Sequence, residues 1–185
     1  MKRALALGLM VFLFGAHVAS SEEMTNHAKI VCDGQEGNRD QYLRMWQVLF
    51  MERDASRVAE FYASQVVSHN SDAGGAGSVV TSEQLAQFWS LSKKVNPERV
   101  LDDELIICSG DYVVVRTLVR STDKMGMFGQ PPTGKSYSTT AIDIYRFVDG
   151  KVVERWGNSD LVSIAQQLGY EVAPRAETKA APEKK

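Results

Sequence analysis

The apolar residues in the first half of the chain recur at helical spacing. Between residues 40 and 50, large apolar side chains repeat every three or four positions, which is typical of a helix with one buried face; they are Tyr42, Met45, Trp46, Leu49 and Phe50. Asp40 is suited to cap this helix. A second short helix is expected after Asp54, and Thr81 with Gln84 matches the capping box of a third.

The second half changes to an alternation of apolar and polar residues. Three segments with this period of two are rich in Val, Ile, Thr and Tyr and predict strands: residues 100–108, 112–121 and 137–147. Asp149 and Gly150 predict a tight hairpin into a further strand at residues 152–154. Residues 161–168 predict a last short helix that ends at Gly169.

Helices followed by antiparallel strands predict an α+β fold. We expect a curved antiparallel sheet that forms a cone, with three to four helices on its concave face and a pocket between the two layers. Alternation places Arg146 on one face of its strand with Ile142 and Ile144, and we expect that apolar face to line the pocket. Residues 123–134 contain two prolines and exposed apolar side chains, which indicates a flap over the ligand.

Composition narrows the class of protein. The 185 residues are 44% hydrophobic and 24% charged, which is typical of a globular domain. Lys and Arg total 21 and Asp and Glu total 23, for a formal net charge of -2. A nucleic-acid-binding protein would need a basic face, so we expect no nucleic acid as a partner.

The first residues have the layout of a secretory signal peptide. Lys2 and Arg3 precede an apolar run over residues 4–16, and small residues follow before Glu22. The alternative is an uncleaved membrane anchor, for which the run is short. We expect a signal peptide at 1–20, a polar leader at 21–38, the cone domain at 39–170 and a disordered tail at 171–185. The mature protein would then be periplasmic or secreted, without a stable membrane anchor.

Two cysteines remain after cleavage. Cys32 and Cys108 would form a disulfide in an oxidising compartment, and the alternative is two unrelated thiols. Other chemistries fit the sequence poorly. It has no nucleophile elbow, its glycine-rich segment at 74–77 lacks the Lys of a phosphate loop, and no metal-ligand cluster is visible.

The second half resembles a known family. The residues that carry the resemblance are the run Gly129–Lys135, the strand end Asp143–Arg146, the run Asp149–Trp156, Asp160 and the segment Gln166–Gly169; Ser68, His69 and Asn70 also fit an early motif. They resemble the SnoaL-like polyketide cyclase family, also labelled predicted ester cyclases, of the nuclear transport factor 2-like superfamily. This resemblance implies an intramolecular aldol closure without metal or cofactor, and it implies that Asp160 is the catalytic aspartate. The superfamily also contains isomerases, dehydratases, hydrolases and non-catalytic binding domains, so the fold does not decide the activity.

The candidate catalytic residues are Asp160, His69 and Arg146, and each has an ordinary structural alternative. Asp160 fits the cap of the last helix. His69 can act as an acid or base, or can bond a backbone carbonyl. Arg146 can stabilise an enolate, or can pair with Glu154 across the hairpin.

The candidate substrate-binding residues are mostly aromatic. Trp156 is expected as a pocket wall or as core, and Trp46, Trp89 and Phe61 as core or as a shelf for the ligand. Phe128 belongs to the flap, and Glu154 lies on the face of Trp156.

Three functions remain open from the sequence. The first is an enzyme that moves protons on a small, apolar, carbonyl-containing molecule without a cofactor, of cyclase or isomerase type. The second is a periplasmic module that binds a small hydrophobic ligand without chemistry. The third is an interaction domain, because both faces of the predicted sheet are partly apolar, and we expect a homodimer.

Overall fold

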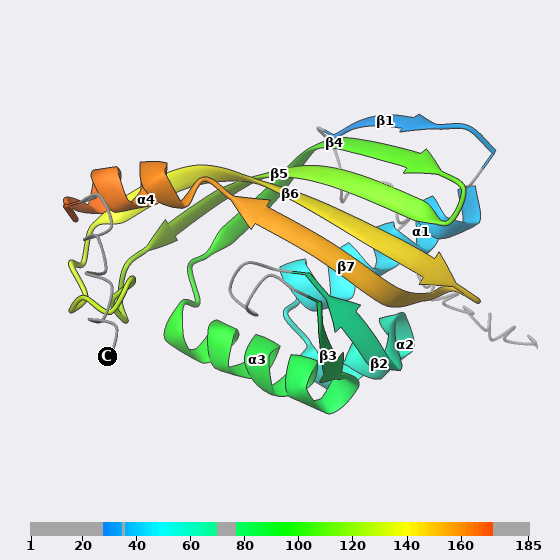
Figure 1. The fold of residues 1–185 in the computed structure, drawn as a ribbon, viewed down its shortest axis with the longest axis horizontal. Helices are drawn as coiled ribbons and strands as arrows, with labels where there is room; N and C mark the ends of the chain where they lie inside the picture. The colour runs from blue at the N-terminus through cyan, green and yellow to red at the C-terminus, as the bar shows by residue number, and fades with distance from the viewer. Residues whose placement is uncertain (1–27, 35, 70–76, 172–185) are drawn as a thin grey trace, which may run out of the picture.

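The computed structural model describes residues 28–34, 36–69 and 77–171. Its centre is one sheet of seven strands in the order β1-β4-β5-β6-β7-β2-β3 (Figure 1). The strands are β1 (Lys29–Cys32), β2 (Tyr62–Ser68), β3 (Ser78–Thr81), β4 (Val100–Ser109), β5 (Tyr112–Thr122), β6 (Ser136–Val148) and β7 (Lys151–Ser159).

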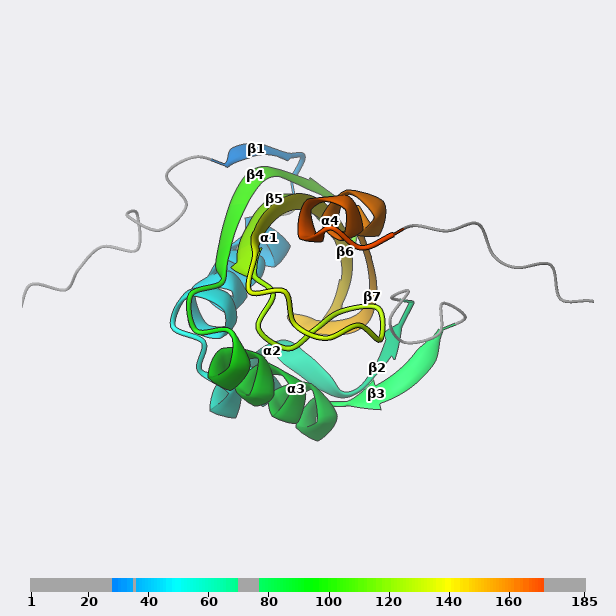
Figure 2. The same ribbon diagram turned by 90° about the vertical axis from the view of Figure 1, so that its left-hand side faces the viewer.

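The four long strands form an antiparallel meander. β4 pairs with β5, β5 with β6, and β6 with β7, all antiparallel. Register shifts after Asp103 in β4 and after Arg146 in β6 bend these strands, because an extra residue on one side of a pair increases local twist. Figure 2 shows the result, a curved sheet that does not close into a barrel.

The helices cover the concave side of this sheet and one of its ends. They are α1 (Glu36–Met45), which continues as the π-helical segment η2 (Trp46–Met51), then the 3-10 turn η3 (Ala55–Arg57), α2 (Val58–Phe61), α3 (Ser82–Val95) and α4 (Leu161–Leu168). Figures 1 and 2 show α1 and α3 on the concave side, and α4 beyond the end of β7. The predicted α+β architecture is confirmed.

The structure adds two features to the predicted sheet. β1 lies within the stretch that we expected to be a polar leader, and it pairs in parallel with β4. β2 pairs in parallel with β7 and antiparallel with the short β3. The sheet is therefore antiparallel at its centre and mixed toward its edges.

Short-range sequence signals set most of the helix ends. The Thr81 hydroxyl accepts a hydrogen bond from Gln84 N at 3.2 Å, and the Gln84 side chain accepts from Thr81 N at 2.8 Å, so the capping box is present. Asp54 Oδ1 accepts from Ser56 N at the start of η3. Gly169 ends α4 with φ of 84°, a left-handed conformation that glycine adopts without strain.

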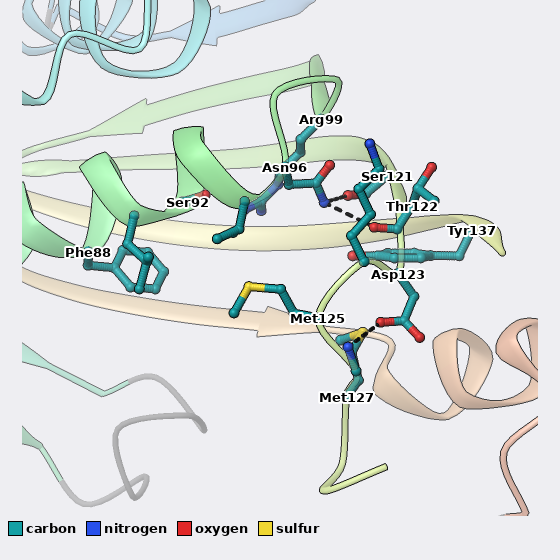
Figure 3. A pocket seen from close by; sticks show the side chains of 14 residues that line it. Phe88, Ser92, Asn96, Arg99, Ser121, Thr122, Asp123, Met125, Met127 and Tyr137 are labelled. Atoms are coloured by element: carbon teal, nitrogen blue, oxygen red, sulfur yellow. Dashed lines mark hydrogen bonds between the residues drawn. The ribbon is translucent and has the colours of Figure 1, made fainter. Parts of the chain in front are cut away.

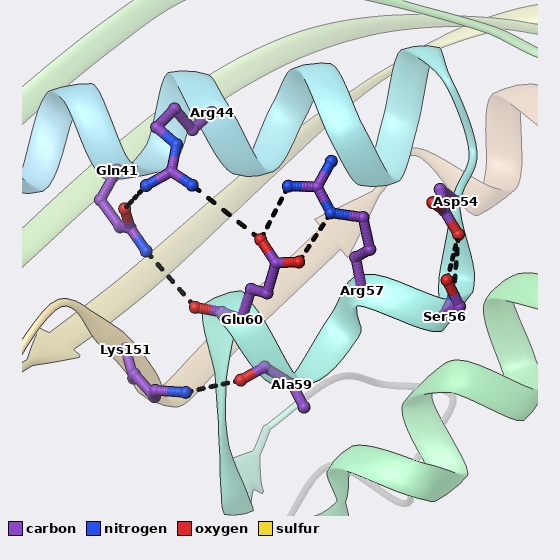
Figure 4. Close-up of polar contacts among 8 residues, drawn as sticks. All are labelled: Gln41, Arg44, Asp54, Ser56, Arg57, Ala59, Glu60 and Lys151. Atoms are coloured by element: carbon purple, nitrogen blue, oxygen red, sulfur yellow. Dashed lines mark hydrogen bonds and ion pairs between the residues drawn. The ribbon is translucent and has the colours of Figure 1, made fainter.

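A charged contact fastens α1 to α2 (Figure 4). The Glu60 carboxylate accepts two hydrogen bonds from Arg57, at 2.7 and 2.8 Å, and lies 3.9 Å from the Arg44 guanidinium. The Gln41 amide also reaches the Glu60 carbonyl. These groups are exposed, so they help to orient α2 against α1 more than they stabilise the fold.

The apolar core fills the end of the cone that holds α1, α2 and the β4–β5 turn. Its fully buried side chains come from these helices and from the inward positions of the strands; they are Tyr42, Met45, Leu49, Val58, Phe61, Tyr62, Val66, Ile106, Val113, Val115, Phe147 and Val152. Phe61 is therefore part of the core, which was one of the two roles considered for it.

The predicted disulfide is confirmed. Cys32 is bonded to Cys108, and the two residues are register partners on the neighbouring strands β1 and β4. The bond ties the short edge strand to the meander. The expected signal peptide and nearly all of the expected tail lie outside the described residues. None of the helices within the described ranges has the length and hydropathy required to span a bilayer.

Candidate functional site in the cone

A cavity of about 600 Å³ lies between the sheet and the helices. Apolar side chains from α3 and the strands form much of its wall, among them Leu85, Phe88, Trp89, Leu101 and Val119. Polar groups enter it from β4, β6 and β7, and they are Asp103, Asp143, Arg155 and Asn158. An apolar pocket with a few convergent polar groups is the usual form of a small-molecule site.

Asp103 is the most enclosed carboxylate of this cavity. It is 4% exposed, Oδ2 accepts a hydrogen bond from Tyr42 Oη at 2.7 Å, and Oδ1 accepts one from Thr117 Oγ1 at 2.7 Å. Burial raises the pKa of Asp103, and these two hydrogen bonds oppose the rise without cancelling it. The local sequence explains the position, because Asp103 pairs with Thr117 on an inward face just before the register shift of β4.

A second polar pair lies on β6 and β7. Arg155 Nη2 lies 3.2 Å from Asp143 Oδ1, and both side chains line the cavity. Asp143 and Tyr145 are two residues apart on β6, and Tyr145 is the register partner of Arg155. The cavity thus carries two acidic side chains and a guanidinium group on its sheet side.

Two tyrosines support these acids. The rings of Tyr42 and Tyr145 lie 5.5 Å apart, and both side chains are buried. Burial raises the pKa of each phenol, and nearby Asp103 and Asp143 raise these pKa values further. Both hydroxyls therefore stay protonated at neutral pH, and that of Tyr42 donates to Asp103.

Four of the residues singled out from the sequence meet elsewhere, on the outer face of the sheet. His69 Nε2 lies 2.9 Å from Glu154 Oε1, and Arg146 Nη1 donates to Glu154 Oε2 at 2.9 Å. The His69 ring stacks on Trp156 at 4.9 Å with 4° between the planes. The hydrogen bond to His69, followed by that from Arg146, lowers the pKa of Glu154.

The expectation that Arg146 faces the cavity is wrong. Alternation grouped Arg146 correctly with Ile142 and Ile144, but this face points outward, and Ile142 is 51% exposed. The inward residues of β6 are Asp143 and Tyr145, which alternate with Ile142, Ile144 and Arg146 along the strand. Because the cavity is partly polar, the more apolar face of the strand is not the inner one. Arg146 forms the cross-hairpin ion pair with Glu154 that was its alternative.

Asp160 caps the last helix. Its Oδ1 accepts a hydrogen bond from Ser163 N at 2.9 Å, and the residue is exposed. Its chain neighbours Ser159 and Leu161 line the cavity, so Asp160 lies at the rim of the cavity. It is not brought together with His69 and Arg146, whose carboxylate partner is Glu154.

The aromatic candidates are divided among three places. Trp89 lines the cavity beside Phe50, with ring centroids 4.9 Å apart, and Trp156 lies on the outer face. Phe128 is 48% exposed and packs edge-on against Tyr170 at 5.9 Å, outside the cavity wall.

The expected flap borders a second, smaller pocket of about 340 Å³ (Figure 3). Met125 and Met127 line it from one side, and Phe88 of α3 from another. Asp123 fixes the loop by accepting hydrogen bonds from Gly126 N, Thr133 N, the Thr133 hydroxyl and the Tyr170 hydroxyl. Within the described residues, no group of three His, Cys, Asp or Glu side chains is placed to hold a metal ion.

Comparisons with known proteins agree with this geometry. Residues 40–168 match the family model of the SnoaL-like polyketide cyclases. IdmH of Streptomyces antibioticus, a candidate polyketide cyclase, is 28% identical, with a TM-score of 0.60 over 71% of this chain and 98% of its own. AclR of Streptomyces galilaeus, a candidate hydroxylase, is 25% identical, with a TM-score of 0.58 over 72% and 96%.

More distant structures share the fold. A candidate polyketide cyclase from Bacillus cereus is 21% identical, with a TM-score of 0.61 over 80% of this chain and 95% of its own. No curated protein matches the sequence. The matched model covers well over half of the chain, from α1 to α4, and the cone, its cavity and the hairpin at Asp149 all lie within it, so the chain belongs to the SnoaL-like polyketide cyclase family.

Proposed function

We propose that the protein is an enzyme that moves a proton at a carbon next to a carbonyl group, on a small apolar molecule held in the cone, without a cofactor. The observation that carries the proposal is Asp103, a buried carboxylate in an apolar cavity whose pKa is raised by burial. A base of raised pKa removes a proton from carbon more readily than an ordinary carboxylate.

The reaction would begin at Asp103. Its carboxylate takes the proton from the carbon, and the electron pair of the C–H bond moves into the carbonyl group to give an enolate. Arg155 faces the same cavity and supplies positive potential for the developing negative charge. In a cyclase the enolate carbon then attacks a second carbonyl carbon of the same molecule, and in an isomerase Asp103 returns the proton to a different carbon.

Asp160 is the second candidate base. The family resemblance implies it, and its position at the cavity rim supports contact with a ligand that projects from the cavity. We place Asp103 first because it is enclosed within the cavity, whereas Asp160 is exposed at its rim.

The test is proton exchange rather than turnover of an unidentified substrate. The mature protein is incubated in deuterium oxide with cyclic aryl ketones such as 2-tetralone, and loss of the α-proton signal is followed by NMR. Wild type should accelerate the exchange, and the catalysed exchange rate of Asp103→Asn should be lower than that of wild type by about 100-fold or more. Asp160→Asn keeps the capping oxygen and is the matched control.

Three outcomes would contradict parts of this proposal. Unchanged exchange in Asp103→Asn, with loss in Asp160→Asn, transfers the role to Asp160. Ketone binding that quenches the fluorescence of Trp89, with no exchange in any variant, identifies a non-catalytic binding module. Neither binding nor exchange contradicts the proposed substrate class.

We also propose that the protein is exported and forms a homodimer. The disulfide between Cys32 and Cys108 supports export, because such bonds persist in oxidising compartments. Large apolar side chains exposed on the outer face support a dimer through that face; they are Val31, Ile107, Tyr112 and Ile142.

A further inference from the structure

Arg99 lies at the junction of the two pockets, and its cationic side chain forms no hydrogen bond or ion pair within the described residues. It is the residue before β4, and it lines both the cone cavity and the smaller pocket beside the loop of Met125. Its Nε is buried and has no hydrogen-bond partner within the described residues. Among the ion pairs formed in residues 28–34, 36–69 and 77–171, none includes Arg99.

The acids nearest to this junction are engaged by other groups. Asp123 accepts hydrogen bonds from two backbone amides and two hydroxyls. Glu98 pairs with Lys124 at 2.6 Å, and Asp143 pairs with Arg155 at 3.2 Å. Asp143 attracts Arg99 through space, but within the described residues none of these acids forms an ion pair with it.

The surroundings of Arg99 favour the binding of an anion. The Arg53 guanidinium lies close by, where it donates to the carbonyls of Asn96 and Pro97 at 2.7 and 3.1 Å. Burial lowers the pKa of both arginines. Repulsion from Arg99 lowers the pKa of Arg53 further. An arginine stays charged in proteins, so a guanidinium held in such a place without a carboxylate raises the free energy of the unliganded protein.

The smaller pocket beside Arg99 also has a large apolar wall. Phe88, Leu91, Val95 and the two methionines of the loop form it, as Figure 3 shows for the labelled residues. Asn96 lies beside Arg99 and donates to Ser121 Oγ and the Thr122 carbonyl, while its own Oδ1 is buried without a partner among the described residues. That oxygen suits a hydroxyl or N–H donor. A ligand that fits here combines an acid group with an apolar body.

We propose that the ligand of the cone carries a carboxylate, and that Arg99 binds this group at the open end of the cavity. Arg99, Leu101 and Asp103 lie at alternate positions of one extended segment, and all three line the cavity. Four residues of strand span about 13 Å between Cα atoms. An acid anchored at Arg99 therefore extends its carbon skeleton, of bicyclic or tricyclic size, toward Asp103. This last step rests on the proposed function, whereas binding of the carboxylate by Arg99 does not.

The experiment measures binding of matched neutral and anionic probes. The probes are 2-naphthoic acid, its methyl ester and 2-naphthalenemethanol, with octanoic acid, methyl octanoate and octanol as a second series. Affinities are measured by calorimetry with wild type, Arg99→Gln and Lys124→Gln. Lys124 is the control, because it lines the same pocket but is already paired with Glu98.

Wild type should bind at least one acid ten-fold or more tighter than its ester. Arg99→Gln should abolish this preference while the ester affinity stays within two-fold of wild type, and Lys124→Gln should keep the preference. Equal binding of acid and ester by wild type, a preference that survives in Arg99→Gln, or no binding of either acid would each overturn the proposal. Acid preference that depends on Arg99, together with ketone exchange unaffected by Asp103→Asn, would leave Arg99 as the anchor and refute Asp103 as the base.

Discussion

The hydroxyl of Tyr42 donates a hydrogen bond of 2.7 Å to Asp103 Oδ2 and so joins α1 to β4 across 61 positions of sequence. The contact sits where the core meets the cavity, because Tyr42 belongs to the core cluster and also lines the cavity. A helix residue thereby holds a strand carboxylate in position and opposes the rise in its pKa that burial causes.

Tyr42→Phe should destabilise the fold and make Asp103 a weaker acid. Loss of a buried hydrogen bond to a charged group costs about 1–3 kcal/mol. That bond lowers the pKa of Asp103, so its removal leaves burial less opposed and moves the pKa further upward. Denaturant unfolding at pH 7 measures the first effect, and carboxyl NMR titration measures the second. A pKa that moves downward would show that the hydrogen bond is not the main effect of Tyr42.

Asp103 should make the protein less stable as pH rises. Its pKa in the folded state lies above the ordinary 3.8, so the folded state holds the proton more tightly than the unfolded state. The favourable contribution is complete below pH 3.8 and is lost as pH rises through the folded-state pKa. The difference in unfolding free energy between wild type and Asp103→Asn should therefore change over that interval, in favour of Asn at higher pH. A constant difference would contradict the raised pKa.

The contribution of Glu154 to stability should change with pH in the opposite direction to that of Asp103. Hydrogen bonds from His69 and Arg146 hold its pKa below the ordinary 4.5, so its contribution is present above pH 4.5 and is lost as pH falls through the folded-state pKa. Glu154→Gln should lower the melting temperature at pH 6 and lower it less at pH 3. The same loss at both values would show that Glu154 acts through packing and not through its charge.

Arg99→Met should leave the stability unchanged or increase it. Within the described residues the guanidinium forms no hydrogen bond or ion pair, so its removal relieves the cost of a partly enclosed charge and loses only the longer-range attraction of Asp143 and Tyr137. Arg57→Met, which loses two hydrogen bonds to Glu60, is the comparison and should not be stabilising. Thermal unfolding of the two variants at low salt decides the matter, and a large loss of stability in Arg99→Met would indicate a structural role.

Removal of the disulfide should weaken the attachment of β1. The bond spans 76 positions, for which the chain-entropy model gives about 4 kcal/mol. Cys32→Ser with Cys108→Ser should therefore unfold at lower denaturant concentration, and amide exchange should increase first in Lys29–Cys32. If exchange stays slow in β1, then its pairing with β4 holds the strand without the bond.

The sequence allowed the succession of elements to be predicted because local signals fix it. The capping box at Thr81, the glycine after α4 and the Asp149-Gly150 hairpin each act over a few residues, and each is present. Both hairpin residues have positive φ, at 49° and 72°, as a tight turn requires. β1 was missed because it has only four residues, and its neighbour β4 follows about 70 positions later.

The site was harder to predict than the fold. Alternation shows which residues of a strand share a face, but the packing of distant helices decides which face is inside. In β6 this packing places Asp143 inside the cavity and Arg146 outside it, the opposite of the expected arrangement. Three consecutive acids, Asp102, Asp103 and Glu104, in a largely apolar strand were a signal that could have been used, since a charged residue within a buried strand needs partners. The partner Tyr42 could not be read from the sequence, because no local rule links it to Asp103.

The register shift after Asp103 divides β4 into two stretches that face different surroundings. Leu101 and Asp103 line the cavity, whereas Ile106 and Cys108 belong to the core. The division continues on β5, where Thr117 lines the cavity and Val115 is core. Substitutions in the cavity half can therefore change what the molecule recognises while the core half continues to specify the fold. The ligand of such a cone can therefore change during evolution with little change in the folding stability of the domain.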